Sequence, residues 1–263
     1  MPAALAGLPV AGLPVGVLVA GFAVLVLAGM VKGLIGMGLP TVGIGLLSLL
    51  LTPAEAAAVL ILPATVTNLW QYFTGPNVAG TARRFGAMMV AVVLGTLAGG
   101  LLLGGLTSPA AVPMLGATLL LYGALGLSAI PLRLPAGCER WLSPLMGLLT
   151  GLVTGTTGVS VMPSAPYLQA LGLNRDDLVQ ALGLTFTVST FALAAVLASP
   201  GEGGAVLTDP MVALASVAAL APAFLGMELG RRIRLAVSPL VFRRVFFAGL
   251  AVLGAYMLAR GFG

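Results

Sequence analysis

Few residues of this chain could do chemistry, and most of them stand in two glycine-rich segments. The first segment runs from Lys32 to Pro40 and includes Gly36 and Gly38; Lys32 is the only lysine of the chain. An ionised side chain between apolar stretches is costly in a bilayer and marks a functional site by default. We expect Lys32 to supply a positive charge to an anion; the alternative is that its ammonium snorkels to the membrane interface.

The second segment, Thr150 to Ser160, carries Gly155, Thr156 and Thr157. A helix that breaks inside a membrane exposes backbone polar groups, so such breaks are tolerated where they line a cavity. A half-helix that begins after the break directs its free N–H groups and the positive end of its dipole into that cavity, which favours an anion. Hydroxyls of Thr156, Thr157 and Ser160 would add neutral donors. The alternative is that the glycines only let helices pack closely.

Polar side chains also form two matching stripes in the helices that follow these segments. Thr65 and Asn68 are three residues apart, and so are Thr187 and Thr190. At this spacing each pair shares one helix face, where hydroxyl and amide groups could bind the oxygen atoms of an anion. The alternative is hydrogen bonding between helices or back to the helix's own carbonyls.

The residue types of enzymes and metal sites are scarce. The sequence has no histidine, and Cys138 is its only cysteine. The commonest catalytic base and metal ligand are therefore missing, and a thiolate metal site would lack partners. Glu55 and Asp177 stand in the first turns of helices, where negative charge complements the dipole. We expect no enzyme, no catalytic residue, no metal site and no cofactor.

The elements that position these residues follow from composition. Of 263 residues, 59% are hydrophobic and 7% are charged, which rules out a soluble globule and predicts an all-α polytopic membrane protein. A bilayer core needs about 20 apolar helical residues. Six uninterrupted stretches meet this length: 53–74, 85–106, 110–130, 177–199, 209–229 and 239–259.

Two further apolar regions are interrupted by glycine, proline and polar residues, about 10–51 and about 141–173. Each arm of the second region has about 14 residues, or roughly 21 Å of helix, which is too short to cross a bilayer. We interpret both regions as hairpins of half-helices. For the first region a full crossing by Val10 to Val31 is the alternative.

Positive charge gathers in short loops, with 12 Lys plus Arg against 7 Asp plus Glu. Such clusters stay cytoplasmic and suggest orientation signals, so no nucleic-acid partner is expected. The loops inside would be those holding Arg83 and Arg84, Arg133 and Arg140, Arg175, and the cluster Arg231, Arg232, Arg234, Arg243 and Arg244. This orientation places both termini in the periplasm of a bacterium, with the chain in the inner membrane.

The two halves resemble each other in order. Gly33 corresponds to Gly151, both opening an interrupted region, and Thr65 and Asn68 correspond to Thr187 and Thr190. Other matched pairs are Glu55 with Asp177, Leu60 with Leu182, Gly95 with Gly226, Gly99 with Gly230, Pro109 with Pro239 and Gly123 with Gly254. Each half, 1–131 and 132–263, then holds one hairpin and three crossings. This odd number inverts the second half, as in secondary transporters.

The chain resembles the sulfite exporter TauE/SafE family, also called the 4-toluene sulfonate uptake permease family. Three segments carry the resemblance: Gly33 to Gly38 followed by Pro53 to Ala56; Gly147 to Leu152; and Gly226 to Arg232 with Leu240 to Arg244 and Gly254. The resemblance implies transport of sulfite, sulfoacetate or related sulfonates.

Together these features predict a secondary transporter whose small anionic substrate sits between the two hairpin tips, with alternating access as one half moves against the other. A passive anion channel and a membrane scaffold without transport are the alternatives. The lipid bilayer is an expected partner, and the sequence leaves a homo-oligomer open.

Overall fold

The computed structural model describes residues 15–128, 134–135, 137–199, 202–233 and 238–261, and their regular structure is entirely helical. The first half contains α1 (Val15–Ile35), α2 (Leu39–Leu47), α3 (Pro53–Phe73), α4 (Val78–Leu102), the short 3-10 helix η2 (Gly105–Thr107) and α5 (Ala111–Ser128). The second half contains α6 (Glu139–Thr157), α7 (Ser164–Ala170), α8 (Arg175–Leu197), α9 (Glu202–Thr208), α10 (Pro210–Ala218), α11 (Leu220–Ile233) and α12 (Pro239–Gly261).

Within the described ranges, seven helices are long and apolar enough to cross a membrane. They are α1, α3, α4 with η2, α5, α8, α10 with α11, and α12. The predicted all-α membrane fold is confirmed. Some residues named in the sequence predictions lie outside the described residues: 10–14, 129–130, Arg133 and Arg234.

The expected first turns are built as the sequence indicates. Thr52 and Glu55 form a reciprocal capping box at the start of α3, in which the Glu55 carboxylate accepts from the Thr52 N–H at 2.8 Å. Asn174 caps α8 by accepting from the Asp177 N–H at 2.9 Å. These caps satisfy backbone donors that a helix start leaves free.

The first interrupted region breaks where it was expected, but its first arm is long. α1 has 21 residues, which at 1.5 Å each is about 31 Å, enough to cross a bilayer. The chain then turns through Gly36 and Gly38, whose φ angles of 79° and 105° favour glycine. The full crossing by the first helix, which the sequence left as an alternative, therefore agrees with the structure.

The second interrupted region differs from the expectation. α6 continues without a break from Glu139 to Thr157, and only Gly158, with φ 74°, ends it. The glycines inside α6 do not interrupt it because they serve as contact points for α4: a Cβ on Gly151 or Gly155 would overlap carbonyl oxygens of that helix. The first arm is thus a 19-residue helix and not a half-helix.

The predicted span 209–229 is divided into α10 and α11 at Ala219. Pro222 explains the division, because proline lacks an N–H and its ring crowds the carbonyl four residues earlier. The preceding segment, expected as a loop, holds the short helix α9.

Glycine contacts join helices of different halves. Gly29 and Gly33 of α1 meet Ala223 and Met227 of α11, so these two helices run parallel. Gly226 and Gly230 of α11 in turn lie against the backbone of α1, as the GxxxG spacing predicts.

The same arrangement joins α6 to α4. Gly147 and Gly151 of α6 face Met88 and Val92 of α4, and Gly95 of α4 faces the turn at Leu148. Each half thus contributes its first helix to a parallel pair with a crossing of the other half, α1 with α11 and α6 with α4.

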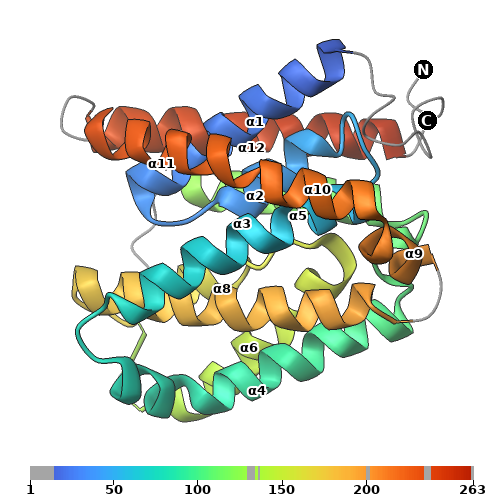
Figure 1. Cartoon of the computed structure of the whole chain (residues 1–263). Coiled ribbons are helices and arrows are strands. Elements are labelled where there is room, and N and C mark those ends of the chain that lie inside the picture. Colours follow the sequence, from blue (N-terminus) through green and yellow to red (C-terminus); the bar gives the residue numbers. More distant parts are fainter. Residues whose placement is uncertain (1–14, 129–133, 136, 200–201, 234–237, 262–263) are drawn as a thin grey trace.

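Two further large pairs are antiparallel. α5 lies against α12, since Gly116 faces the turn from Gly254 to Leu258 whereas Gly123 faces the turn from Phe247 to Ala251. α3 lies against α8 (Figure 1), where the buried Gln180 side chain donates to the Tyr72 carbonyl at 2.9 Å and accepts from the Asn77 N–H at 3.0 Å.

Figure 1 shows the helices stacked with similar axes, α1, α11 and α12 on one side, α4 and α6 on the other, and α3 and α8 between them. One end of this bundle carries the starts of α4, α6, α8 and α12 and the end of α11. We call it the arginine end, after its exposed Arg83, Arg84, Arg140, Arg175, Arg231, Arg232, Arg243 and Arg244. The start of α1 and Arg260 of α12 lie at the opposite end (Figure 1).

Ion pairs at the arginine end are superficial. Glu228 binds Arg231 and Arg232 at 2.7 and 2.8 Å, at the helical spacing seen in the sequence. Arg84 of α4 donates two hydrogen bonds to Glu139 of α6, at 2.7 and 2.8 Å. These bonds lower the pKa of the Glu139 carboxyl below its ordinary value.

Candidate substrate-binding site

Lys32 is buried in the last turn of α1, with 3% of its surface exposed. Its Nζ donates to Thr67 Oγ1 at 3.0 Å and to Asn68 Oδ1, both on α3. The ammonium therefore points into the protein and does not snorkel. None of the ion pairs among the described residues includes Lys32, although a buried charge normally requires a partner.

The neighbours of Lys32 leave donors unused. An ammonium has three hydrogens, of which Thr67 and Asn68 accept two. The Asn68 Nδ2 group is fully buried and has no partner. Lys32 and Asn68 together thus present N–H donors that no described protein acceptor satisfies, and such donors suit an oxyanion.

The first tip begins directly after this cluster. The Gly36 N–H donates to the Lys32 carbonyl at 2.8 Å and closes α1, and Gly38 is the N-cap of α2. A Cβ on Gly36 would lie 3.6 Å from Val179, near the start of α8. The first tip therefore lies toward the arginine end.

The second tip lies at the other level of the bundle. A Cβ on Gly158 would meet Ile44, Leu106 and Ala57, the last of these in the second turn of α3. Because α3 and α8 are antiparallel, this level is remote from the start of α8. The two glycine turns therefore lie at different levels of the bundle, although Pro40 of the first segment and Gly158 and Ser160 of the second line one small pocket.

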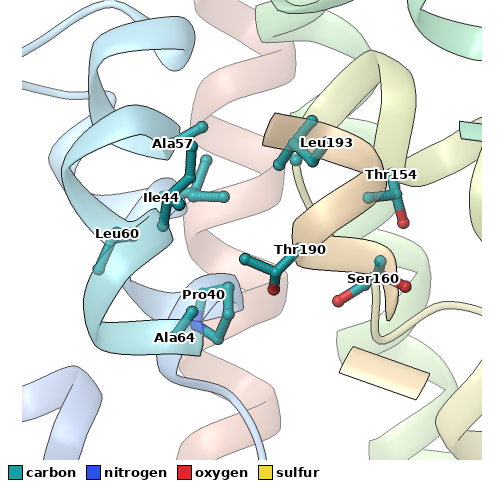
Figure 2. A pocket seen from close by; sticks show the side chains of 12 residues that line it. Pro40, Ile44, Ala57, Leu60, Ala64, Thr154, Ser160, Thr190 and Leu193 are labelled. Carbon is teal, nitrogen blue, oxygen red and sulfur yellow. The ribbon is translucent and has the colours of Figure 1, made fainter. Parts of the chain in front are cut away.

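A small pocket lies beside the second tip, between α2, α3, α6 and α8. Its first wall is apolar and comes from the first half of the chain: Pro40, Ile44, Ala57, Leu60, Ile61 and Ala64. Its second wall comes from the second half: Thr154, Gly158, Ser160, Ser189, Thr190 and Leu193. Figure 2 shows Thr154, Ser160 and Thr190 on the side opposite Pro40, Ile44 and Leu60.

Hydroxyl groups of this pocket differ in how they are bonded. Thr190 Oγ1 donates to the Phe186 carbonyl at 2.7 Å, and Thr154 Oγ1 donates to the Thr150 carbonyl at 2.7 Å. Ser189 Oγ is buried and has no partner. Among the described residues, the pocket thus combines two hydroxyls bonded to their own helices with two, those of Ser160 and Ser189, that have no hydrogen-bond partner.

The other predicted residues lie outside both places. Thr65 is partly exposed on α3, and Thr187 is buried and donates to the Gly183 carbonyl at 2.7 Å. Thr156 and Thr157 are buried and donate to carbonyls of their own helix, and Gly155 packs against α4. The structure therefore brings together Lys32 with Asn68 and Ser160 with Thr190.

Sequence reasoning missed Thr67, Thr154 and Ser189. Thr67 and Ser189 directly precede Asn68 and Thr190, which the repeat already matched. That shared register was the signal that could have found them.

The glycine pairings, the buried lysine and the pocket are features that a known family can be compared with. The family model for the sulfite exporters TauE/SafE matches residues 21–257, nearly the whole chain. The chain belongs to the TauE/SafE family. No curated protein and no solved structure was found to match it.

TauE/SafE proteins are membrane transporters of sulfite or related anions. Membership confirms the resemblance drawn from the glycine tips and the terminal motifs. It also agrees with a transport role and not an enzymatic one.

Proposed function

We propose that this chain is a secondary transporter of sulfite or a small organosulfonate, such as sulfoacetate, in the bacterial inner membrane. The observation that carries the proposal is Lys32, a buried ammonium bonded only to the neutral groups of Thr67 and Asn68. A bound anion would supply the missing negative charge. In a medium of low dielectric constant this attraction is much stronger than in water.

The donors match the oxygen atoms of such a substrate. The third hydrogen of Lys32 Nζ and the two hydrogens of Asn68 Nδ2 would each bind one oxygen of a sulfite or sulfonate group. Charge-assisted hydrogen bonds of this kind are about twice as strong as neutral ones. The cluster therefore favours a trigonal oxyanion over a neutral solute.

We also propose that the two halves, 1–131 and 132–263, are inverted repeats. The reciprocal pairs support this, because α1 with α11 and α6 with α4 exchange under the repeat, while α3 with α8 and α5 with α12 are antiparallel pairs of equivalent helices. An axis in the membrane plane produces antiparallel pairs of this kind.

The two units that move against each other during alternating access cannot be the two sequence halves. Separating the halves would break the backbone contacts at Gly29, Gly151 and Gly226. We propose instead that the pair of α1 and α11 moves against the pair of α4 and α6, with α3 and α8 between them.

Flux of a radiolabelled sulfonate into proteoliposomes tests the proposal. We expect Lys32→Met to reduce uptake at least about tenfold, since a lost charge-assisted bond is worth about 1.5–3 kcal/mol. Thr118→Val is the control, because this exposed threonine donates only to the Met114 carbonyl of its own helix. Undiminished uptake by a folded Lys32→Met protein would contradict the site.

The same assay separates a transporter from a channel. A secondary transporter saturates with substrate and accumulates it against a gradient when a driving ion is supplied. Flux that rises linearly and never exceeds equilibrium would favour a passive anion channel.

A further inference from the structure

The pocket beside the second tip is lined by four hydroxyl groups, and each can present an oxygen lone pair to a ligand. The hydroxyl hydrogens of Thr154 and Thr190 are engaged with carbonyls of their own helices, so these oxygens offer only acceptors to the pocket. Ser189, 1% exposed, has an oxygen without any partner. Acceptor oxygens are what a hard cation binds.

The helix that ends at this pocket adds a field of the same sign. α6 has 19 residues and stops at Gly158, which lines the pocket together with Ser160. The last carbonyls of a helix lack intrahelical donors, and the C-terminal end carries about half a negative charge. The end of α6 therefore favours a cation, against the positive end of the shorter helix α2, whose Pro40 also lines the pocket.

The repeat register relates this pocket to the Lys32 cluster. Lys32 and Thr154 are 122 residues apart, and each stands four residues before the positive-φ glycine that follows its helix, Gly36 or Gly158. Thr67 and Asn68, which bind the ammonium, correspond to Ser189 and Thr190. The second half thus keeps the oxygen ligands of the ammonium but has a threonine in place of the lysine.

The chemistry of the lining selects the kind of cation. None of the lining residues is titratable, so the pocket cannot take a proton at physiological pH, and it has no carboxylate to neutralise a divalent ion. The free space holds about one water-sized particle, too little for a sulfonate. We propose that the pocket binds one Na⁺ ion, which takes in the second half the place of the Lys32 ammonium in the first.

This ion would also couple to the anion, a role that rests on the proposed transport. Thr67 Oγ1 accepts from Lys32 and donates to the Pro63 carbonyl at 2.7 Å, with the Ala64 carbonyl oxygen 3.2 Å away. Ala64 in turn lines the pocket. Occupation of the pocket can therefore shift α3 and the donors that face the anion.

Binding of ²²Na⁺ to the purified full-length protein in detergent, without any sulfur anion, tests the site. We expect one saturable site per chain, with at least about tenfold weaker affinity in Ser189→Ala, since each ligand to an ion contributes at least a factor of this size. Thr185→Val is the matched control: Thr185 is a buried α8 residue that donates to the Ala181 carbonyl and lies outside the pocket.

No saturable Na⁺ binding, or equal affinity in wild type and Ser189→Ala, would overturn the site. Protection by sulfite that is lost in Ser189→Ala would instead assign the pocket to the anion and also overturn it. Because no anion is needed for the binding assay, its result is independent of the transport proposal, which fails if Na⁺ binds but Lys32→Met transports normally.

Thr154→Lys gives a second and more specific test. Thr154 lines the pocket, and a lysine there would place an ammonium where the ion is proposed to bind. We expect this variant to fold, as judged by gel filtration, and to lose Na⁺ binding. Unchanged Na⁺ affinity in folded Thr154→Lys would refute the equivalence of ion and ammonium.

Discussion

Lys32 and Asn68 form the smallest unit that gives this protein a chemical preference. The amide oxygen of Asn68 accepts from the ammonium, while its NH₂ group stays free for a second acceptor. An asparagine at this position orients the charge without neutralising it. A carboxylate at this position would instead neutralise the charge by forming an ion pair with Lys32.

Asn68→Asp is therefore expected to abolish anion uptake while leaving the fold intact. The new carboxylate would pair with Lys32 and occupy the charge that the substrate needs, whereas Asn68→Ala would only remove one donor group. We expect at least about a tenfold lower uptake for Asn68→Asp than for Asn68→Ala. Equal uptake by the two variants would mean that the Lys32 charge does not attract the anion.

At the scale of helices, glycine decides which elements touch. Gly151 of α6 lies against the Val92 carbonyl of α4, and a Cβ there would overlap it. A Cβ on Gly249 of α12, in contrast, would have no neighbouring atom within 4 Å. Gly151 is therefore needed for a close contact between two helices, whereas Gly249 is not.

Gly151→Ala is expected to lower the stability of the detergent-solubilised protein by about 1–3 kcal/mol, the usual cost of overpacking. Gly249→Ala should leave stability unchanged or raise it slightly, because alanine is the better helix former. Thermal unfolding of both variants measures the difference. A loss as large for Gly249→Ala would show that glycine content, and not the α4 contact, governs stability.

The Arg84–Glu139 bridge joins the starts of α4 and α6 and contributes to the stability of the fold in a pH-dependent way. Since the folded pKa of Glu139 is lowered, the bridge stabilises the protein fully above the ordinary carboxyl pKa and is lost as the pH falls toward the folded value. The Arg84 side chain is 46% exposed, which limits the effect to about 1 kcal/mol. We expect Glu139→Gln to unfold at a slightly lower temperature than wild type at neutral pH, with a difference that shrinks as the pH falls below the ordinary carboxyl pKa.

Helix positions were predictable because apolar length and first-turn residues are local signals. Thr52 with Glu55 and the spacing of Gly95 with Gly99 gave a capping box and a packing face as expected. The end of α6 was not predictable, since glycines break a helix or support it depending on whether another helix lies against them. Gly155 met α4, and only the fold could show that.

The candidate site was predictable for residues marked by charge or repeat register, such as Lys32 and Asn68. Thr156, Thr157 and Thr187 were poorer candidates because a threonine hydroxyl can bond to its own helix, which is what these three do. Sequence alone does not distinguish the two uses of a hydroxyl.

For the whole molecule, the separation of the arginine end from the opposite end predicts its orientation. Cys138 is partly exposed and directly precedes Glu139 at the arginine end. In intact cells a membrane-impermeant maleimide should leave Cys138 unlabelled, and permeabilisation should allow labelling, since basic loops stay inside.

The exposed Thr107 at the opposite end supplies the control. In a Cys138→Ser background, Thr107→Cys should react in intact cells. Labelling of native Cys138 from outside, with Thr107→Cys protected, would reverse the orientation.

The parallel pair of α1 and α11 also matters while the protein is being made. α1 leaves the ribosome long before α11, so its Gly29 and Gly33 face must wait in lipid for a partner near the other end of the chain. A nascent chain that stops before Leu220 would leave this glycine face of α1 uncovered. Lys32 would reach its partners only once α3 had been made. The earliest helix thus docks only late in synthesis, and truncated products should be recognised by membrane proteases through the uncovered glycines.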